Sequence, residues 1–173
     1  MTIRPVERED IMAVLRRIDD PELPISIVDL GLVEHLCIEG GSVDIDLVPT
    51  FIGCPALDMI EGEVREQVAA LAGVETVTVR FRNDPPWSVD RISTAGRQRL
   101  AEHGVTVADS GSRLAVAGHE PAAATVTLQT SAIPCPYCYS TRTRMESPFG
   151  PTRCRQIFYC DACRTSFEHM RSV

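Results

Sequence analysis

Four cysteines near the end of the chain are spaced as two pairs, Cys135-Pro-Tyr-Cys138 and Cys160-Asp-Ala-Cys163. Two thiolates separated by two residues can turn back onto one ion, and a second pair completes a tetrahedral shell of four sulfurs. The 21 residues between the pairs are enough for a short antiparallel hairpin. Because four protein sulfurs leave no open coordination position, this spacing predicts a structural metal site that does no chemistry.

Zinc is the metal that this ligand set favours, and iron bound as in rubredoxin is the alternative, since four thiolates accept either ion. Without a metal, the same cysteines would form two disulfides or remain four unrelated buried thiols. Many zinc knuckles place Gly directly after the second cysteine, where the backbone often has a positive φ. In the two CxxC pairs of this chain, called knuckles from here on, Tyr139 and Arg164 occupy those places. The sequence therefore does not decide which backbone conformation the two knuckles adopt.

A fifth cysteine, Cys54, has no CxxC partner and stands between Gly53 and Pro55. Proline suits the first position of a helix, so Cys54 is predicted to be the N-cap of the helix that follows. Backbone N–H groups and the helix dipole at that end favour a thiolate, which predicts a lowered pKa for Cys54. Gly53 would allow close approach of a partner or metal. The alternative is that Cys54 only caps the helix as a small buried residue.

The remaining residues offer weaker candidates. No paired acid and base, nucleophile triad or phosphate loop is recognisable, which argues against an independent enzyme. Cys37 is expected in the core, and Cys154 is expected to be structural, with a role as substitute ligand left open. Three carboxylates cluster around one turn: Asp20, Glu22 and Asp29. Asp29, which stands before a Leu-Gly pair, is expected to accept hydrogen bonds from backbone amides, and a metal role for these carboxylates is the alternative.

Composition is that of a soluble globular protein with one ordinary domain and a small appended module: 173 residues, 44% hydrophobic and 24% charged. No membrane-spanning run or signal-peptide pattern is recognisable, and seven cysteines with this spacing favour a reducing cytoplasm. The net charge of −7 is uneven, with −10 on residues 1–130 and +3 on residues 131–173. An acidic body argues against a general nucleic-acid binder and leaves that function open for the small module alone.

Hydrophobic periodicity predicts the elements that must position these cysteines. Helices are expected over residues 6–18, 55–72 and 89–102, and strands over residues 32–38, 43–47 and 76–81. The first two strands should pair as a hairpin, and Trp87 should anchor the last helix. The order α-β-β-α-β-α predicts an α+β fold, a small mixed-sheet α/β sandwich. Residues 108–130, rich in Ala, Gly, Ser and Thr, are expected to be a linker that can lend a strand to the metal module.

Several stretches carry a resemblance to a known family. Residues 20–33, followed by Pro49-Thr50 and Gly53-Cys54-Pro55, resemble the MIP18-type domain of iron–sulfur assembly factors, and this likeness covers roughly residues 5–82. With a helix behind Trp87 and the four-cysteine module that follows, the whole chain resembles the PaaD family of the phenylacetate-degradation operon. The stretch Phe149–Cys154 also fits that family.

The resemblance implies an organisation in three parts: a MIP18-like iron–sulfur assembly domain over residues 1–107, a linker over 108–130 and a zinc ribbon over 131–173. PaaD-like proteins are encoded with a multicomponent oxygenase that epoxidises the ring of phenylacetyl-CoA, using a di-iron subunit and an iron–sulfur flavin reductase. The resemblance therefore implies a non-catalytic accessory factor that helps mature or deliver the iron–sulfur cluster of that system, with those oxygenase components as its partners.

For the site, the resemblance implies Cys54 as a ligand of iron or of a transient iron–sulfur cluster, with Asp29, Thr50 and Gly53 shaping its pocket. Zinc at Cys135, Cys138, Cys160 and Cys163 would be structural. One thiolate cannot hold a [2Fe–2S] cluster, which needs four ligands. A homodimer that contributes two Cys54 thiolates, or a partner that contributes ligands, would therefore be required.

Two other functions stay open on the sequence. A nucleic-acid-binding adaptor built on the zinc ribbon would use its +3 charge, and its binding would depend steeply on salt. A purely structural oxygenase subunit would need Cys54 only as a cap, so that oxygenase activity would survive Cys54→Ser.

Overall fold

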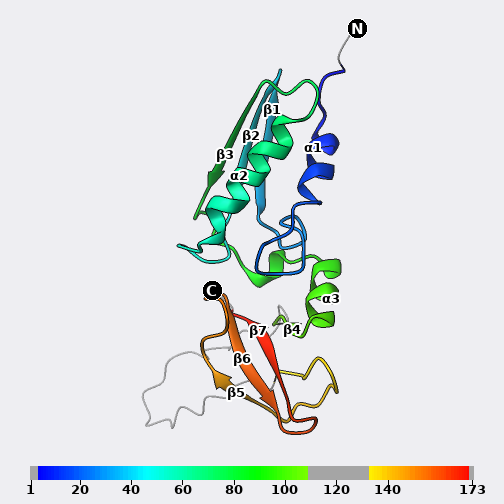
Figure 1. Ribbon diagram of the computed structural model, residues 1–173, viewed down its shortest axis with the longest axis vertical. Coiled ribbons are helices and arrows are strands. Elements are labelled where there is room, and N and C mark those ends of the chain that lie inside the picture. Colours follow the sequence, from blue (N-terminus) through cyan, green and yellow to red (C-terminus); the bar gives the residue numbers. More distant parts are fainter. Residues whose placement is uncertain (1–3, 109–132, 172–173) are drawn as a thin grey trace, which may run out of the picture.

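The computed structural model describes residues 4–108 and 133–171, and its two β-sheets follow one another along the long axis (Figure 1). The first sheet has the order β1-β2-β3, from β1 (Val33–Glu39), β2 (Ser42–Leu47) and β3 (Thr76–Phe81). β1 and β2 pair antiparallel as the expected hairpin, whereas β2 and β3 pair parallel. The small mixed sheet predicted from the sequence is therefore confirmed.

Two helices pack with this sheet. α2 (Ala56–Ala69) connects the parallel strands β2 and β3 and runs along the sheet, and α1 (Arg8–Leu15) contacts α2 (Figure 1). The buried residues Ile60, Val64 and Val68 recur every four positions on α2, so that they form one face of the helix. Both helices end earlier than their periodicity predicts. α1 ends at Leu15 and not near residue 18, and α2 ends at Ala69 and not near residue 72.

The expected helix over residues 89–102 is two elements, a 3₁₀ turn η1 (Val89–Arg91) and the helix α3 (Thr94–Glu102). Ser93 interrupts them with an extended backbone, and its hydroxyl accepts a hydrogen bond from the Gly96 amide at 2.9 Å. Serine is among the preferred N-caps because its oxygen binds an otherwise unpaired amide of the first turn. The continuous helix was therefore a wrong prediction. The buried Trp87 donates its indole N–H to the Leu30 carbonyl at 3.0 Å, which anchors this segment to the turn before β1.

The second sheet has the order β4-β7-β6-β5, and its last three strands along the chain form the ribbon, residues 133–171. Its strands β5 (Thr143–Ser147), β6 (Arg155–Cys160) and β7 (Thr165–Met170) pair antiparallel, and the short β4 (Val105–Thr106) adds to β7 in parallel. The strand lent to the ribbon thus directly follows α3. The expected linker over residues 108–130 lies, apart from residue 108, outside the described residues.

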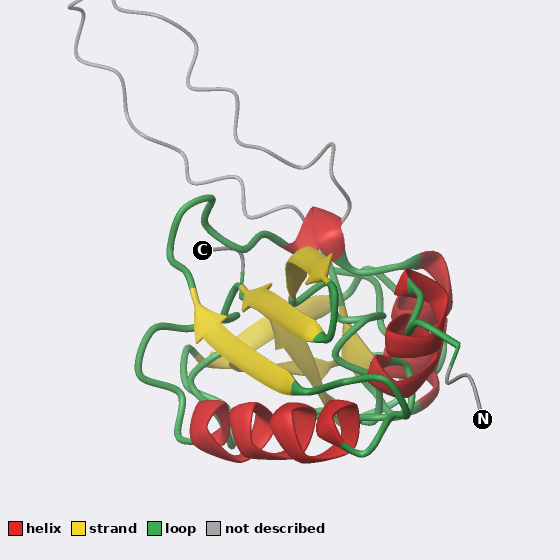
Figure 2. Cartoon of the chain, turned by 90° about the horizontal axis from the view of Figure 1, so that it is seen from above, coloured by secondary structure: helices red, strands yellow, loops and turns green. Residues whose placement is uncertain are grey.

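The larger hydrophobic core joins the N-terminal module, residues 4–108, to the ribbon. Val105, Cys154 and Met170 belong to the same buried cluster as α1, α2 and the first sheet. Gly104 brings the modules together at a second point, since a Cβ there would collide with the Tyr137 hydroxyl. Along the long axis α3 lies between the two sheets (Figure 1). Seen from above, the strands of the chain overlap in the middle and helices lie around them (Figure 2). Within the described residues, no helix has the length and hydropathy needed to cross a membrane.

Candidate metal centre and the cavity at Cys54

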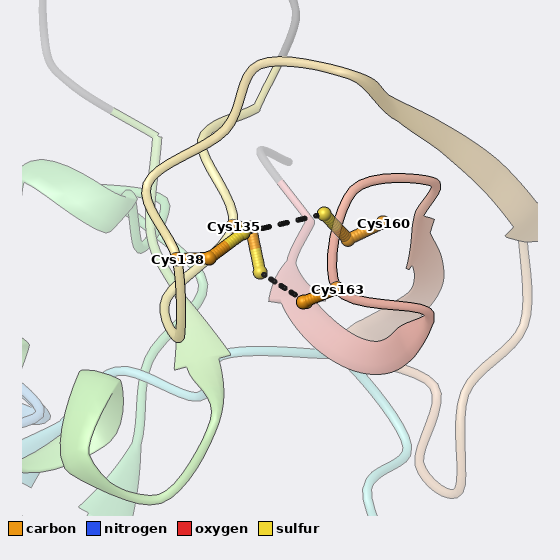
Figure 3. Close-up of side chains that lie close together, drawn as sticks. All are labelled: Cys135, Cys138, Cys160 and Cys163. Carbon is orange, nitrogen blue, oxygen red and sulfur yellow. Dashed lines mark hydrogen bonds between the residues drawn. The ribbon is translucent and has the colours of Figure 1, made fainter.

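The four cysteines of the two knuckles converge on one point (Figure 3). All four sulfur atoms lie within 4.8 Å of one another, and the Sγ–Sγ distances from Cys135 to Cys163 and from Cys138 to Cys160 are both 3.6 Å. A zinc ion with bonds of about 2.3 Å to sulfur requires tetrahedral edges of about 3.8 Å. The four thiols therefore fit a tetrahedral ion, and they leave no coordination position for another ligand.

The knuckle backbones adopt the left-handed turn although neither has the usual glycine. Tyr139 has φ 58° and Arg164 has φ 60°. The Tyr139 amide donates to the Cys135 carbonyl at 2.9 Å, and the Arg164 amide donates to the Cys160 carbonyl at 2.8 Å, which closes each turn. The Cys163 amide also helps to lower the pKa of the Cys160 thiol to about 7. Both knuckles therefore keep the usual left-handed turn without glycine, and Tyr139 and Arg164 are strained as a result.

Cys54 lies in the turn between β2 and α2, one residue before the helix cap. Its amide donates to the Phe51 carbonyl and its carbonyl accepts from the Leu57 amide, each at 3.3 Å. The N-cap position belongs to Pro55, so the prediction of Cys54 as the cap was wrong by one residue. The predicted lowering of its pKa was wrong as well. Burial raises the pKa of Cys54, and this outweighs the opposing effect of the Ala56 amide at the helix end.

A cavity of about 260 Å³ opens beside Cys54, between the N-terminal module and the ribbon. Its first wall comes from Glu22 and from the turn that carries Phe51, Cys54 and Pro55, and its second wall is the ribbon segment 149–154. The Arg153 guanidinium carbon lies 5.8 Å from the centre of the Phe51 ring, so a cation–π contact joins the two walls. The site around Cys54 is thus built by both modules.

Cys154 is the second thiol of this cavity. It is buried within the main core, and its sulfur lies 3.1 Å from the Thr152 hydroxyl. Burial raises the pKa of Cys154, and the negative charges of Glu22 and Asp20 raise the pKa values of both Cys154 and Cys54 further. Both thiols therefore hold their protons near neutral pH.

The other predicted site residues lie outside the lining of this cavity. Asp29 accepts the Ser93 hydroxyl at 2.6 Å and the Ser26 hydroxyl at 3.0 Å, so it ties the turn before β1 to the cap of α3. Thr50 is half-buried, and Gly53 is exposed with φ 83°. Their role in shaping the Cys54 pocket stays a prediction.

Two further expectations can be compared with the structure, and one feature of the site was not expected. Backbone amides were expected to donate to Asp29, but its carboxylate accepts serine hydroxyls. Asp20 instead accepts hydrogen bonds from the Glu22 amide at 2.8 Å and the Leu23 amide at 3.0 Å. Cys37 is half-buried on β1, so its placement in the core was wrong. That Cys154 faces the same cavity as Cys54 was not predicted. The two cysteines are 100 residues apart, so their spacing does not indicate that they face one cavity. The one sequence signal was the likeness of the stretch Phe149–Cys154 to the family.

Comparison with known proteins decides the family. Residues 8–79 match the family described as "Iron-sulfur cluster assembly protein", and residues 119–171 match the "PaaD zinc beta ribbon domain". Over 173 residues the chain is 34% identical to an Escherichia coli (strain K12) protein that is named as one subunit of a "Putative 1,2-phenylacetyl-CoA epoxidase", with 99% of this chain and 97% of the relative covered. The chain belongs to the PaaD family.

Shorter relatives share about half of this PaaD-family chain. It is 38% identical over 87 residues to the Fe-S protein maturation auxiliary factor YitW of Bacillus subtilis (strain 168), which covers 50% of this chain and 85% of the relative. A similarly named factor of Porphyromonas gingivalis is 36% identical over 86 residues, covering 49% of this chain and 82% of the relative. The crystal structure of a domain of unknown function from Bacillus anthracis is 32% identical, with a TM-score of 0.51 over 53% of this chain and 89% of that domain. The predicted α+β fold class is confirmed.

Proposed function

We propose that this chain is an accessory factor of a multicomponent phenylacetyl-CoA ring epoxidase, and that it helps mature or deliver the iron–sulfur cluster of that system in phenylacetate catabolism. The observation that carries the proposal is the likeness along nearly the whole chain to a protein named as an epoxidase subunit, combined with the match of residues 8–79 to an iron–sulfur assembly family. Relatives named as maturation factors support the same role for this domain.

In this proposal the chain has three parts with different roles. The assembly domain, residues 1–107, receives iron or a cluster at Cys54. A linker over residues 108–130 connects it to the zinc-ribbon domain, residues 131–173. The four ribbon cysteines hold a structural ion, for which zinc is proposed because a closed shell of four thiolates suits a metal without redox chemistry. The iron–sulfur cluster is cargo, so the chain itself catalyses no reaction.

The partners in this proposal are the oxygenase components, with the iron–sulfur flavin reductase as the recipient of the cluster. Free thiols at Cys37, Cys54 and Cys154 fit a reducing compartment, which supports a cytoplasmic location. A nucleic-acid adaptor is less well supported by the charges of the ribbon. Arg144 pairs with Asp161 at 3.5 Å, and the buried Arg155 pairs with Glu168.

The proposal is tested by producing the oxygenase components with this chain, with its Cys54→Ser variant, or without it. Iron and acid-labile sulfide per reductase, and ring epoxidation of phenylacetyl-CoA, are then measured. We expect both to fall in the absence of the chain and to stay low with Cys54→Ser. Full activity with Cys54→Ser, but not without the chain, would favour a structural subunit instead. Full cluster content without the chain would overturn the maturation role.

A further inference from the structure

Two thiols that lie far apart in the sequence line one cavity of this protein. Cys54 comes from the turn before α2, and Cys154 comes from the loop between β5 and β6. The structure leaves both cysteines free, and neither belongs to the four-sulfur group of the knuckles. The cavity therefore contains a second, independent pair of thiols that the ribbon metal does not use.

The ribbon loop that carries Cys154 is held firmly in place. The Cys154 carbonyl accepts a hydrogen bond from the Arg171 amide at 2.9 Å, and the Gly150 amide donates to the Arg155 carbonyl at 2.9 Å. The Arg155 side chain also donates to the Thr152 hydroxyl at 2.8 Å, and that hydroxyl contacts the Cys154 sulfur. These contacts fix the second thiol within the ribbon. The Arg153–Phe51 contact and the place of Cys154 in the main core hold the loop against the N-terminal module.

The lining of the cavity suits a soft cation. Phe51, Pro55, Phe149 and Pro151 supply apolar surface around the two sulfurs, and Glu22 adds a carboxylate to the lining. Thiolate sulfur prefers copper(I), zinc and the iron of iron–sulfur clusters over hard cations. The negative charges of Glu22 and Asp20, which act on both thiols, favour a bound cation over an anion.

We propose that Cys54 and Cys154 form a two-thiolate site for iron or an iron–sulfur cluster, with the remaining ligands supplied by the donor or recipient protein. The use of the site in cluster handling rests on the proposed function, whereas the pairing of the thiols rests on the cavity alone. Each thiol gives its proton to solvent as its sulfur binds iron, and no electrons are transferred. One chain then supplies half of a four-ligand shell, so a homodimer of two Cys54 thiolates is unnecessary.

The contrast with the ribbon site explains the use of only two thiolates. Four protein sulfurs close a shell and retain their ion, whereas a half-filled shell leaves positions through which another protein can take over the cargo. A carrier needs this second arrangement.

The pairing is tested first on the zinc-loaded, reduced full chain with dibromobimane, which links two thiols when each displaces one bromide. Peptide mapping by mass spectrometry should find Cys54 joined to Cys154. The link should disappear in Cys54→Ser and in Cys154→Ala, and it should persist in Cys37→Ser, whose half-buried thiol lies outside the cavity lining. Absence of the link in the unmutated chain would overturn the pairing, whatever the function of the protein.

Binding is tested on the same four proteins by anaerobic incubation with ferrous iron and sulfide, and by counting iron and labile sulfide per chain. Loss of a residue that only hydrogen-bonds to a metal ligand already costs about 10–100-fold in metal affinity, so loss of either direct ligand should weaken binding at least tenfold. Cys37→Ser should bind as the unmutated chain does. Zinc content verifies that each ribbon is folded, and Cys154→Ala is chosen because alanine fills the buried position without adding a polar group.

The outcomes separate the two proposals. Weak binding in Cys54→Ser together with normal binding in a zinc-loaded Cys154→Ala would overturn the two-thiolate site and leave the proposed function standing. Normal binding in both variants would overturn the site and also remove the role of Cys54. If Cys154→Ala loses zinc, the dibromobimane link in the unmutated chain decides the pairing by itself.

Discussion

The N-terminal module and the ribbon are stabilised by different means. The module has a core of buried aliphatic side chains from two helices and three strands, and Ile11, Ile45 and Val64 are fully buried in it. The separate core of the ribbon contains four buried residues, and two of them belong to the four-cysteine group: Cys135, Phe158, Cys160 and Phe167. Domains below about 40 residues usually need a metal, a disulfide or a partner to fold. The described ribbon, residues 133–171, is of this size.

The largest expected effect follows from removing the ribbon metal. Chelation, or Cys160→Ser, should unfold the ribbon, because structural zinc supplies about 10–16 kcal/mol of apparent binding energy in zinc-finger peptides. The N-terminal module should stay folded on its own core. Hydrogen exchange followed by mass spectrometry should show amide protection lost in β6 and kept in β2. Equal loss in both strands would show that the two modules fold as one unit, with the shared contacts of Val105 and Met170 as its cause.

The converse change weakens the module and spares the metal site. Ile45 is fully buried in the central strand β2, and Ile45→Ala should reduce the free energy of unfolding by about 2–5 kcal/mol. Urea denaturation of the zinc-loaded protein gives this loss, and competition with a chromophoric chelator gives the zinc affinity. The affinity should remain unchanged. A parallel fall in zinc affinity would contradict the comparison, because the ribbon would then depend on the module core.

The free energy of unfolding is expected to depend on pH because of a buried histidine at the edge of the ribbon that contacts the module. Burial lowers the pKa of His169 to about 4, and its Nδ1 lies 2.8 Å from the Thr106 hydroxyl of β4. The unfolded chain, with a histidine pKa near 6.5, binds this proton first, so stability falls as pH falls through 6.5 toward 4. At about 1.4 kcal/mol per pKa unit, the total loss is about 3 kcal/mol.

The test compares urea unfolding of the unmutated chain and His169→Gln between pH 7 and pH 4.5. Acid also releases zinc by protonating thiolates, so the difference between the two proteins carries the result. His103→Gln is the matched control, since His103 is exposed. Identical pH profiles for the unmutated chain and His169→Gln would contradict the prediction.

The same comparison shows which features the sequence could predict. The convergence of the four ribbon cysteines follows from spacing because the pattern is local: two residues separate the members of each pair, and the hairpin brings the pairs together. The first sheet follows from alternation, since Val43, Ile45 and Leu47 are buried on one face of β2. In both cases neighbouring residues determine the result.

The features that the sequence could not predict depend on tertiary contacts. The pKa of Cys54 was predicted from the helix end, yet burial against the rest of the fold determines its direction. The break at Ser93 depends on Asp29, which lies 64 residues earlier and binds both the Ser93 amide and its hydroxyl. The position of Cys154 beside Cys54 depends on how the ribbon packs on the module. Periodicity and spacing carry no information about such contacts.

The smallest expected effect concerns the two strained knuckle residues. Arg164 is exposed and has φ 60°, a conformation that costs non-glycine residues about 1–2 kcal/mol. Arg164→Gly removes this strain but also gives the unfolded chain more freedom, so the net gain should be about 1 kcal/mol or less. The gain should appear as tighter zinc binding in chelator competition, because metal binding and ribbon folding are coupled. The stability of the N-terminal module should not change.

Arg142→Gly, at an exposed position whose φ is not positive, is the matched control and should bring no gain in zinc affinity. Equal gains in both variants would mean that lost positive charge, and not relieved strain, tightens the site.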